Sequence, residues 1–185
     1  MSAGRDTLEY DPLVAASPGT GLPHGRSYWT ETLEGEPADD GAAPASADTD
    51  VAIIGGGYTG LSCAYFLAHD YGIKATVLEA NRSGWGCSGR NGGFARAAIG
   101  RHTWGKVIEL WGRETARVMF RQALSAVETV RELIAAGAQC DATAPGHLKI
   151  AHRPSRAAGL RAEAELLQHE FEYPASFLTA AETQE

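Results

Sequence analysis

Cysteines, long apolar runs and clustered basic residues are all scarce in this 185-residue sequence. The three cysteines, Cys63, Cys87 and Cys140, are odd in number and form no CxxC pair, which argues against a disulfide framework or structural zinc and favours a reducing compartment. No stretch approaches the roughly 20 apolar residues that cross a bilayer, and no basic segment followed by an apolar run marks a signal peptide. We therefore expect a cytoplasmic protein with no membrane span.

The basic residues are too dispersed for a nucleic-acid partner, which would need a cationic stripe to neutralise phosphates. The formal net charge of −7 is concentrated near the N-terminus, where residues 1–50 hold ten acidic side chains against Arg5 and Arg26. The six histidines show no pair at metal-ligand spacing such as HxxxH, and no GxSxG motif marks a nucleophile. The sequence thus predicts neither a nucleic-acid partner nor a metal site.

The N-terminal part, residues 1–49, is rich in Gly, Pro, Ala, Ser and acidic residues, and residues 34–49 have the composition of a solvated linker. This composition predicts a mobile leader and linker. Within it, residues 27–33 form an apolar island that contains Tyr28 and Trp29. We expect the island to dock a short helix on the folded part, although an exposed island would also fit the sequence.

Ordered structure is predicted to begin at Asp50. Residues 51–54 form a short apolar run that ends in glycines, the pattern of a strand buried on both faces. A helix is predicted over residues 58–70, before Gly72, and a second strand over residues 74–79. A strand, a helix and a strand within about thirty residues form a right-handed crossover, which implies a parallel sheet.

The remaining sequence predicts two long helices with a strand between them. Residues 104–136 carry an apolar stripe at helical spacing that Gly137 closes, residues 147–151 alternate like a half-buried strand, and residues 155–170 return to a helical pattern. The stripe consists of Ile108, Trp111, Thr115, Val118, Met119, Ala126, Val130, Leu133 and Ile134. We expect the first of these helices to serve packing alone.

The last residues match the start of a helix. Thr179 and Glu182 have the spacing of a capping box, in which a hydroxyl and a carboxylate satisfy backbone donors. Only three residues follow. We expect from this that the chain is part of a longer protein, and the alternative is a frayed natural terminus.

Three glycines, Gly55, Gly57 and Gly60, spell GxGxxG between the first predicted strand and the helix. The first permits a tight turn, the second lets the backbone approach a pyrophosphate, and the third allows close packing of the helix on the sheet. The N–H groups of Tyr58 and Thr59, at the helix start, are expected to face phosphate. In this context the pattern predicts a dinucleotide-binding site rather than an accidental glycine loop.

An acidic residue, Glu79, ends the second predicted strand 19 residues after Gly60. A carboxylate at this place accepts hydrogen bonds from both ribose hydroxyls of an adenosine and repels a 2′-phosphate, which disfavours NADP. FAD and NAD share the adenosine diphosphate half, so these residues alone do not separate the two cofactors.

A second glycine-rich run, SGWGCSGRNGG over residues 83–93, follows the strand that bears Glu79. Together with DVAIIGGGYTGLSCAYFLA and VLEA, it resembles the FAD-dependent amine and amino-acid oxidase family, which includes D-amino-acid, glycine and sarcosine oxidases. The likeness is nearest to the gamma-glutamylputrescine oxidase branch. It covers about residues 27–185 and is strongest over residues 50–93.

The resemblance implies a three-layer α/β, Rossmann-like FAD-binding domain with a parallel sheet over residues 50–185. The domain is expected to be incomplete, with the start of an antiparallel substrate domain near residue 145. The second run is expected to line the path of the pyrophosphate, ribityl chain and flavin ring. The residues concerned are Ser88, Gly89, Arg90, Asn91 and Gly92, with a surface cation as the alternative for Arg90 and a turn residue as the alternative for Asn91.

By the same resemblance, the parent enzyme oxidises the C–N bond of a small-molecule amine or amino acid with hydride transfer to FAD. Dehydrogenases related to this family carry a histidine near the position of Arg90 that bonds covalently to the flavin. This sequence has none there, so noncovalent FAD is expected, and the alternative is a covalent link from a residue beyond residue 185. Cys87 is interpreted as a small buried side chain rather than a redox group. No catalytic residue is indicated, and the chain alone is expected to be inactive. The alternatives are a fragment of an NAD-linked dehydrogenase and a noncatalytic nucleotide-binding remnant.

Overall fold

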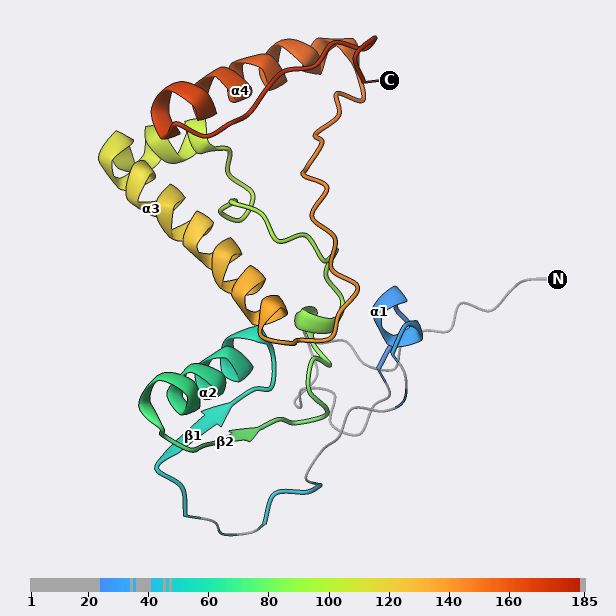
Figure 1. Ribbon diagram of the computed structural model, residues 1–185, viewed down its shortest axis with the longest axis vertical. Helices are drawn as coiled ribbons and strands as arrows, with labels where there is room; N and C mark the ends of the chain where they lie inside the picture. The colour runs from blue at the N-terminus through green and yellow to red at the C-terminus, as the bar shows by residue number, and fades with distance from the viewer. Residues whose placement is uncertain (1–23, 34, 36–40, 45, 47, 184–185) are drawn as a thin grey trace, which may run out of the picture. The chain divides into compact units, whose positions relative to one another are not determined.

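The computed structural model describes residues 24–33, 35, 41–44, 46 and 48–183, and the chain divides into two compact units between Gly93 and Phe94 (Figure 1). The predicted mobility of the leader and linker falls largely on positions outside the described residues. The fold is mixed α/β with a two-stranded parallel sheet. The elements in chain order are α1 (Tyr28–Glu31), β1 (Val51–Ile54), α2 (Tyr58–Tyr71), β2 (Ala75–Leu78), the 3₁₀ turn η1 (Cys87–Gly89), α3 (Trp104–Ala135), the 3₁₀ turn η2 (Pro154–Arg156) and α4 (Ala157–Phe171).

The strand–helix–strand prediction is confirmed in the first unit. β1 and β2 pair in parallel, with Val51 opposite Ala75, and α2 packs on both strands. Helix α2 ends where Gly72 adopts the left-handed conformation, with φ 65°, and donates its N–H to the Ala68 carbonyl. The prediction that β1 is buried on both faces is wrong, because Ile54 is 91% exposed. Among the described residues, α2 covers only one face of this two-stranded sheet.

The apolar island does form a docked helix. Ser27 caps the single turn of α1, and the Trp29 indole N–H donates to the Asn91 carbonyl at 2.7 Å. A four-residue helix has little stability of its own, so its contacts with the second glycine-rich run stabilise it. Tyr28, by contrast, is 68% exposed.

Helix α3 matches its predicted length, but its predicted buried face only in part. Gly112 has non-helical angles, φ 80° and ψ 163°, and interrupts the helix. The residues after this break no longer continue the helical phase of those before it. Trp111 and Val118 of the predicted stripe are 47% and 43% exposed. The buried core is Trp104, Val107, Ala116 and Phe120, and Ile108 and Met119 of the predicted stripe pack against it.

Helix α4 covers this core in the second unit. The ring of Phe171 stacks on Phe120 with centroids 4.5 Å apart. Arg113 and Arg117 of α3 both pair with Glu170 of α4. The prediction of a helix over residues 155–170 is confirmed, since α4 begins two residues later and ends one residue later than predicted. None of the described helices combines the length and the apolar character needed to cross a bilayer.

The predicted strand over residues 147–151 is wrong. The segment has no ladder partner among the described residues, and Ile150 is 73% exposed. Alternation of apolar side chains is compatible with an extended chain, but a strand also requires a neighbour for its backbone hydrogen bonds.

The predicted capping box at the end of the described chain is present. The Thr179 backbone N–H donates to a Glu182 carboxylate oxygen at 2.7 Å, and the Glu182 N–H donates to the Thr179 hydroxyl at 3.4 Å. The backbone and side-chain hydrogen bonds from Thr179 lower the pKa of the Glu182 carboxyl.

Candidate functional site

A cavity of about 370 Å³ opens at the N-terminus of α2. Its lining comes from the end of β1, the glycine loop (residues 55–60), Cys63 of α2 and Ser88 of the second run (residues 83–93). The first N–H groups of a helix have no partner within the helix, and the helix dipole adds roughly half a positive charge at this end. A cavity at this position suits an anionic ligand.

The three glycines of the loop are required for different steric reasons. Gly55 has φ 103°, a backbone conformation that residues other than glycine rarely adopt. A Cβ on Gly57 would lie 2.8 Å from the Ser88 hydroxyl oxygen. A Cβ on Gly60 would overlap the Gly55 carbonyl oxygen and lie 3.2 Å from Ile53, which agrees with its predicted role in packing the helix on the strand.

Glu79 lies beside the glycine loop rather than apart from it. Its carboxylate accepts the Gly56 N–H at 2.6 Å and the Asn81 N–H at 3.1 Å, and the residue is half-buried. An ionised carboxylate has about four acceptor sites, so these two bonds fix its orientation and leave capacity for ribose hydroxyls.

The two glycine-rich runs meet at the start of α2. The Tyr58 N–H donates to the Ser88 hydroxyl at 2.9 Å, while Thr59 lines the cavity. The predicted phosphate donor Tyr58 is therefore already paired with the hydroxyl of Ser88 in the second run. Gly84 reinforces the junction, since its N–H donates to the Gly56 carbonyl at 2.9 Å.

Within the second run, Asn91 makes the most side-chain hydrogen bonds. Its amide donates to the Ser88 carbonyl at 2.9 Å, and its side-chain oxygen accepts the Gly93 N–H at 2.8 Å. The first of these bonds closes a turn, as the alternative interpretation of Asn91 required. Gly89 is tightly enclosed, because a Cβ there would overlap the Gly84 carbonyl oxygen. Gly92 is exposed.

Arg90 is directed back onto its own run. Its Nε donates to the Trp85 carbonyl at 2.9 Å, and its guanidinium lies 4.5 Å from the centre of the Trp85 ring. The guanidinium thus packs on an aromatic face. Cys87 is exposed, so the interpretation of a small buried side chain is wrong. The exposure follows from its place at the start of the surface turn η1.

Sequence reasoning missed Gly56, Gly84 and Cys63. Gly56 is the middle residue of the GGG triplet, and a Cβ there would lie 3.2 Å from Glu79. The uninterrupted triplet was a signal that this position also tolerates no side chain. Cys63 lies three residues after Gly60 on the same helix face, which was the available sign that it borders the cavity. No pattern in the sequence indicates the hydrogen bond between Gly84 and Gly56.

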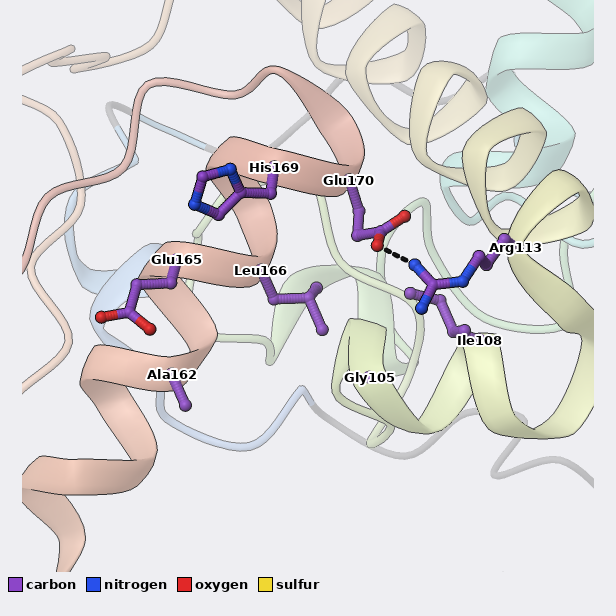
Figure 2. Close-up of a pocket in the computed structure, with 8 residues that line it drawn as sticks. All are labelled: Gly105, Ile108, Arg113, Ala162, Glu165, Leu166, His169 and Glu170. Carbon is purple, nitrogen blue, oxygen red and sulfur yellow. Dashed lines mark ion pairs between the residues drawn. The ribbon is translucent and has the colours of Figure 1, made fainter.

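A second cavity, of about 290 Å³, lies between α3 and α4 in the other unit (Figure 2). Figure 2 shows Arg113 and Glu170 pairing across it, with Ile108 and Leu166 on its apolar side. The two charges compensate each other, and the apolar groups belong to the packing of the helices. This cavity is a feature of helix packing rather than a convergence of ligand-binding groups.

No three His, Cys, Asp or Glu side chains gather at metal-binding distance in the described part of the chain. The glycine-lined cavity is therefore the site that the geometry favours, and its groups fit the two phosphates and the ribose of a dinucleotide. Glycines around a helix N-terminus and a carboxylate at the end of the second strand are the groups that dinucleotide-binding sites use for the phosphates and the ribose.

Residues 50–185 match the family described as FAD dependent oxidoreductase. Among curated proteins, the probable oxidoreductase OrdL of Rhizobium meliloti is 36% identical over 161 residues, which are 86% of this chain and 37% of that protein. The gamma-glutamylputrescine oxidoreductase of Escherichia coli is 44% identical over 90 residues, 48% of this chain and 20% of that protein. The probable oxidoreductase OrdL of Haemophilus influenzae is 38% identical over 93 residues, 50% of this chain and 21% of that protein.

The matched region thus spans well under half the length of each of these relatives. No solved structure gives a significant match to the chain.

Proposed function

The chain belongs to the FAD-dependent oxidoreductase family, and on this premise we propose that its glycine-lined cavity binds FAD noncovalently. The observation that carries the proposal is the hydrogen bond from Gly56 to Glu79, which brings the ribose acceptor next to the phosphate loop. In our proposal Gly55, Gly57, Tyr58, Thr59, Gly60 and Glu79 hold the adenosine diphosphate half. Ser88, Gly89, Arg90, Asn91 and Gly92 border the flavin half.

Each proposed contact has a separate physical basis. Gly57 allows the backbone to approach the pyrophosphate, and the positive end of α2 attracts its charge. Glu79 is already oriented by two backbone donors, so little side-chain entropy is lost when it accepts the ribose hydroxyls. Ser88 either shares its hydroxyl between the Tyr58 amide and a phosphate oxygen or yields that amide to the phosphate.

We propose that the parent activity is the oxidation of an amine or amino-acid C–N bond. FAD, when bound, supplies the two-electron acceptor for such chemistry. The name of the Escherichia coli relative gives gamma-glutamylputrescine as what that protein acts on, which supports an amine as the substrate class here. No described residue is assigned a catalytic role.

We further propose that residues 50–185 are the N-terminal part of a three-layer, Rossmann-like FAD-binding domain, preceded by a leader and linker over residues 1–49. The parallel crossover and the span of the family match support the domain assignment. The free thiols of Cys63, Cys87 and Cys140 support a reducing, cytoplasmic location.

The first experiment is a visible absorption spectrum of the purified chain after incubation with FAD and removal of unbound cofactor. A flavin spectrum whose chromophore is released by acid supports noncovalent FAD. Binding of NAD without FAD would support an NAD-linked dehydrogenase, and binding of neither would support a noncatalytic remnant.

The variant Gly57→Val tests the location of the site. The added methyl groups would occupy the space beside Ser88, so we expect loss of FAD binding with an unchanged circular dichroism spectrum. Flavin retained at the wild-type level would show that the glycine loop is not the cofactor site.

Oxygen consumption with a panel of amines and amino acids, in the presence of FAD, tests the prediction that the chain alone does not turn over substrate. The described residues provide no cover for a bound amine, so the rate advantage of positioning is largely absent. Steady turnover by the 185-residue chain would contradict this part of the proposal.

A further inference from the structure

Helix α1 contacts the second run at several points, although it precedes the family match that begins at residue 50. The Trp29 indole N–H donates to the Asn91 carbonyl at 2.7 Å, and the Ser27 hydroxyl donates to the Gly89 carbonyl at 3.4 Å. The Trp29 ring lies so close to Gly93 that a Cβ there would be 2.6 Å from it. The contacts therefore combine directed hydrogen bonds with an aromatic ring over a glycine.

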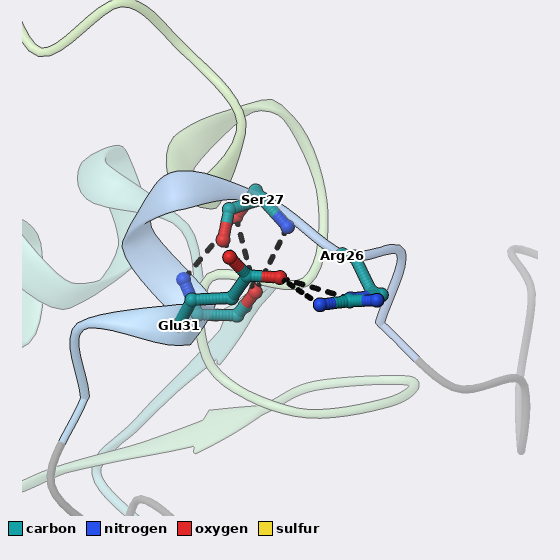
Figure 3. Close-up of polar contacts among 4 residues, drawn as sticks. Arg26, Ser27 and Glu31 are labelled. Atoms are coloured by element: carbon teal, nitrogen blue, oxygen red, sulfur yellow. Dashed lines mark hydrogen bonds and ion pairs between the residues drawn. The ribbon is translucent and has the colours of Figure 1, made fainter.

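Polar contacts hold α1 in shape (Figure 3). The Ser27 hydroxyl accepts the Thr30 N–H at 3.3 Å, and the Thr30 hydroxyl accepts the Ser27 N–H at 2.9 Å, which is a complete capping box. Arg26 adds an ion pair to Glu31 at 2.6 Å. The indole is thus presented from a capped turn rather than from a free chain.

The contact at Asn91 continues into the cofactor cavity. The Asn91 side chain bonds to the Ser88 carbonyl at 2.9 Å, and the Ser88 hydroxyl accepts the N–H of Tyr58 at the start of α2 at 2.9 Å. Trp29 is therefore connected through Asn91 and Ser88 to the helix terminus that faces the phosphates. A chain of hydrogen bonds of this kind fixes backbone that glycines would otherwise leave free.

We propose that Trp29 is a positioning residue for the flavin half of the cofactor site. This inference rests on the proposed FAD binding and adds a residue that the glycine motifs do not contain. The indole N–H and the ring hold the backbone of residues 91–93, and through Asn91 they set the position of Ser88. The adenosine half is held mainly by the glycine loop and Glu79, and it depends on Trp29 only through Ser88.

The test compares FAD with ADP as ligands of the full chain by calorimetry. Trp29→Phe keeps a ring near Gly93 but removes the N–H donor, and Trp29→Ala removes both. We expect FAD to bind roughly threefold to tenfold more weakly to Trp29→Phe, the effect of one net hydrogen bond, and more weakly still to Trp29→Ala. ADP affinity should fall by less than FAD affinity, since Ser88 is the only group positioned by Trp29 that borders the phosphates of ADP.

The matched control is Leu33→Ala, which shortens an apolar side chain that follows α1 and is 55% exposed. It should leave both affinities unchanged. The visible circular dichroism of bound flavin gives a second readout, because a displaced second run changes the surroundings of the ring while the overall fold remains. A change of this signal in Trp29→Phe, with an unchanged melting temperature, supports positioning.

Equal FAD affinity and an unchanged flavin signal in all variants would overturn the inference. Parallel loss of FAD and ADP binding would overturn it as well, because the effect would then be general destabilisation. A wild-type chain that binds ADP but not FAD would refute the proposed cofactor, and with it the role of Trp29, whereas normal FAD binding in Trp29→Phe would refute only the role of Trp29.

Discussion

Each of the two units of this chain has a different kind of residue in its interior. Among the described residues of the first unit, the buried positions are Gly56 and Gly60. In the second unit they are Trp104, Val107, Ala116 and Phe120. The first unit buries backbone against backbone and keeps a cavity at its glycine loop, while the second fills its interior with apolar side chains.

This difference separates the region of the proposed cofactor site from a region that serves packing. Close approach of backbone segments requires the absence of side chains, and it leaves polar N–H and carboxylate groups available for a ligand. An apolar cluster excludes water and contributes stability in proportion to the surface it buries. Substitutions that remove buried side-chain atoms should therefore lower the stability of the second unit. Substitutions that add atoms at buried glycines should lower the stability of the first.

The largest effect should follow from Phe120→Ala. Phe120 is 3% exposed and contacts the rings of Trp104 and Phe171. We expect the free energy of unfolding of the second unit to fall by about 3–5 kcal/mol, from lost burial and the cavity left behind. Denaturant titration measures it. Val118→Ala, on the same helix but 43% exposed, is the control, and an equal effect of the two substitutions would contradict the assigned core.

Glu79→Ala should weaken ligand binding in the first unit. The change removes an acceptor that two backbone N–H groups orient, and we expect FAD and ADP binding to weaken by about 1.5–3 kcal/mol, the range for hydrogen bonds to a charged group. Calorimetry on folded protein measures both ligands. Unchanged ADP affinity would show that Glu79 serves only to close the loop around Gly56.

A pair of glycine substitutions tests whether added atoms act oppositely in the two units. Gly60→Ala should destabilise the first unit by roughly 1–3 kcal/mol, because its Cβ would overlap the Gly55 carbonyl oxygen. At Gly159, in α4, an added Cβ would have no atom within 4 Å. Gly159→Ala should therefore stabilise the second unit by up to about 1 kcal/mol, since alanine has a higher helix propensity than glycine. Thermal unfolding measures both. Equal signs for the two substitutions would refute the comparison.

The smallest effect concerns a polar contact within the second unit. Hydrogen bonds from Thr179 lower the pKa of Glu182, so the capping box contributes its stability above the carboxyl's ordinary pKa and loses it as the pH falls through the lowered value. In Thr179→Ala the hydroxyl bond is lost, and the pKa of Glu182 should rise part of the way towards its ordinary value. A carboxyl NMR titration measures it, with the other glutamates as internal controls.

Local patterns correctly predicted the elements whose residues interact within a short stretch of chain. The crossover around α2, the end of that helix at Gly72 and the capping box at Thr179 all agree with the structure. Each of these depends on sterics or hydrogen bonds over a few residues, or on a motif with a fixed geometry.

The failures lie where the outcome depends on distant parts of the chain. The segment 147–151 has the alternation of a strand but no neighbour to pair with among the described residues. The predicted stripe of α3 runs through Gly112, where the helix is interrupted, and the residues that are buried against Leu166, Leu167 and Phe171 are only partly those of the stripe. Periodicity describes one continuous element and does not indicate where that element breaks or what covers it.

The sequence by itself determined the glycine loop, the helix that follows it and the acidic residue at the end of β2, because side-chain size and backbone freedom at Gly55, Gly57 and Gly60 act locally. Only the tertiary structure decided that Gly56 orients Glu79, that Ser88 meets the start of α2, and that Trp29 holds Asn91. These contacts join residues 23 to 62 positions apart. Nothing in a local pattern specifies such a pairing, since it arises only when the whole unit folds and brings the two glycine-rich runs and α1 together.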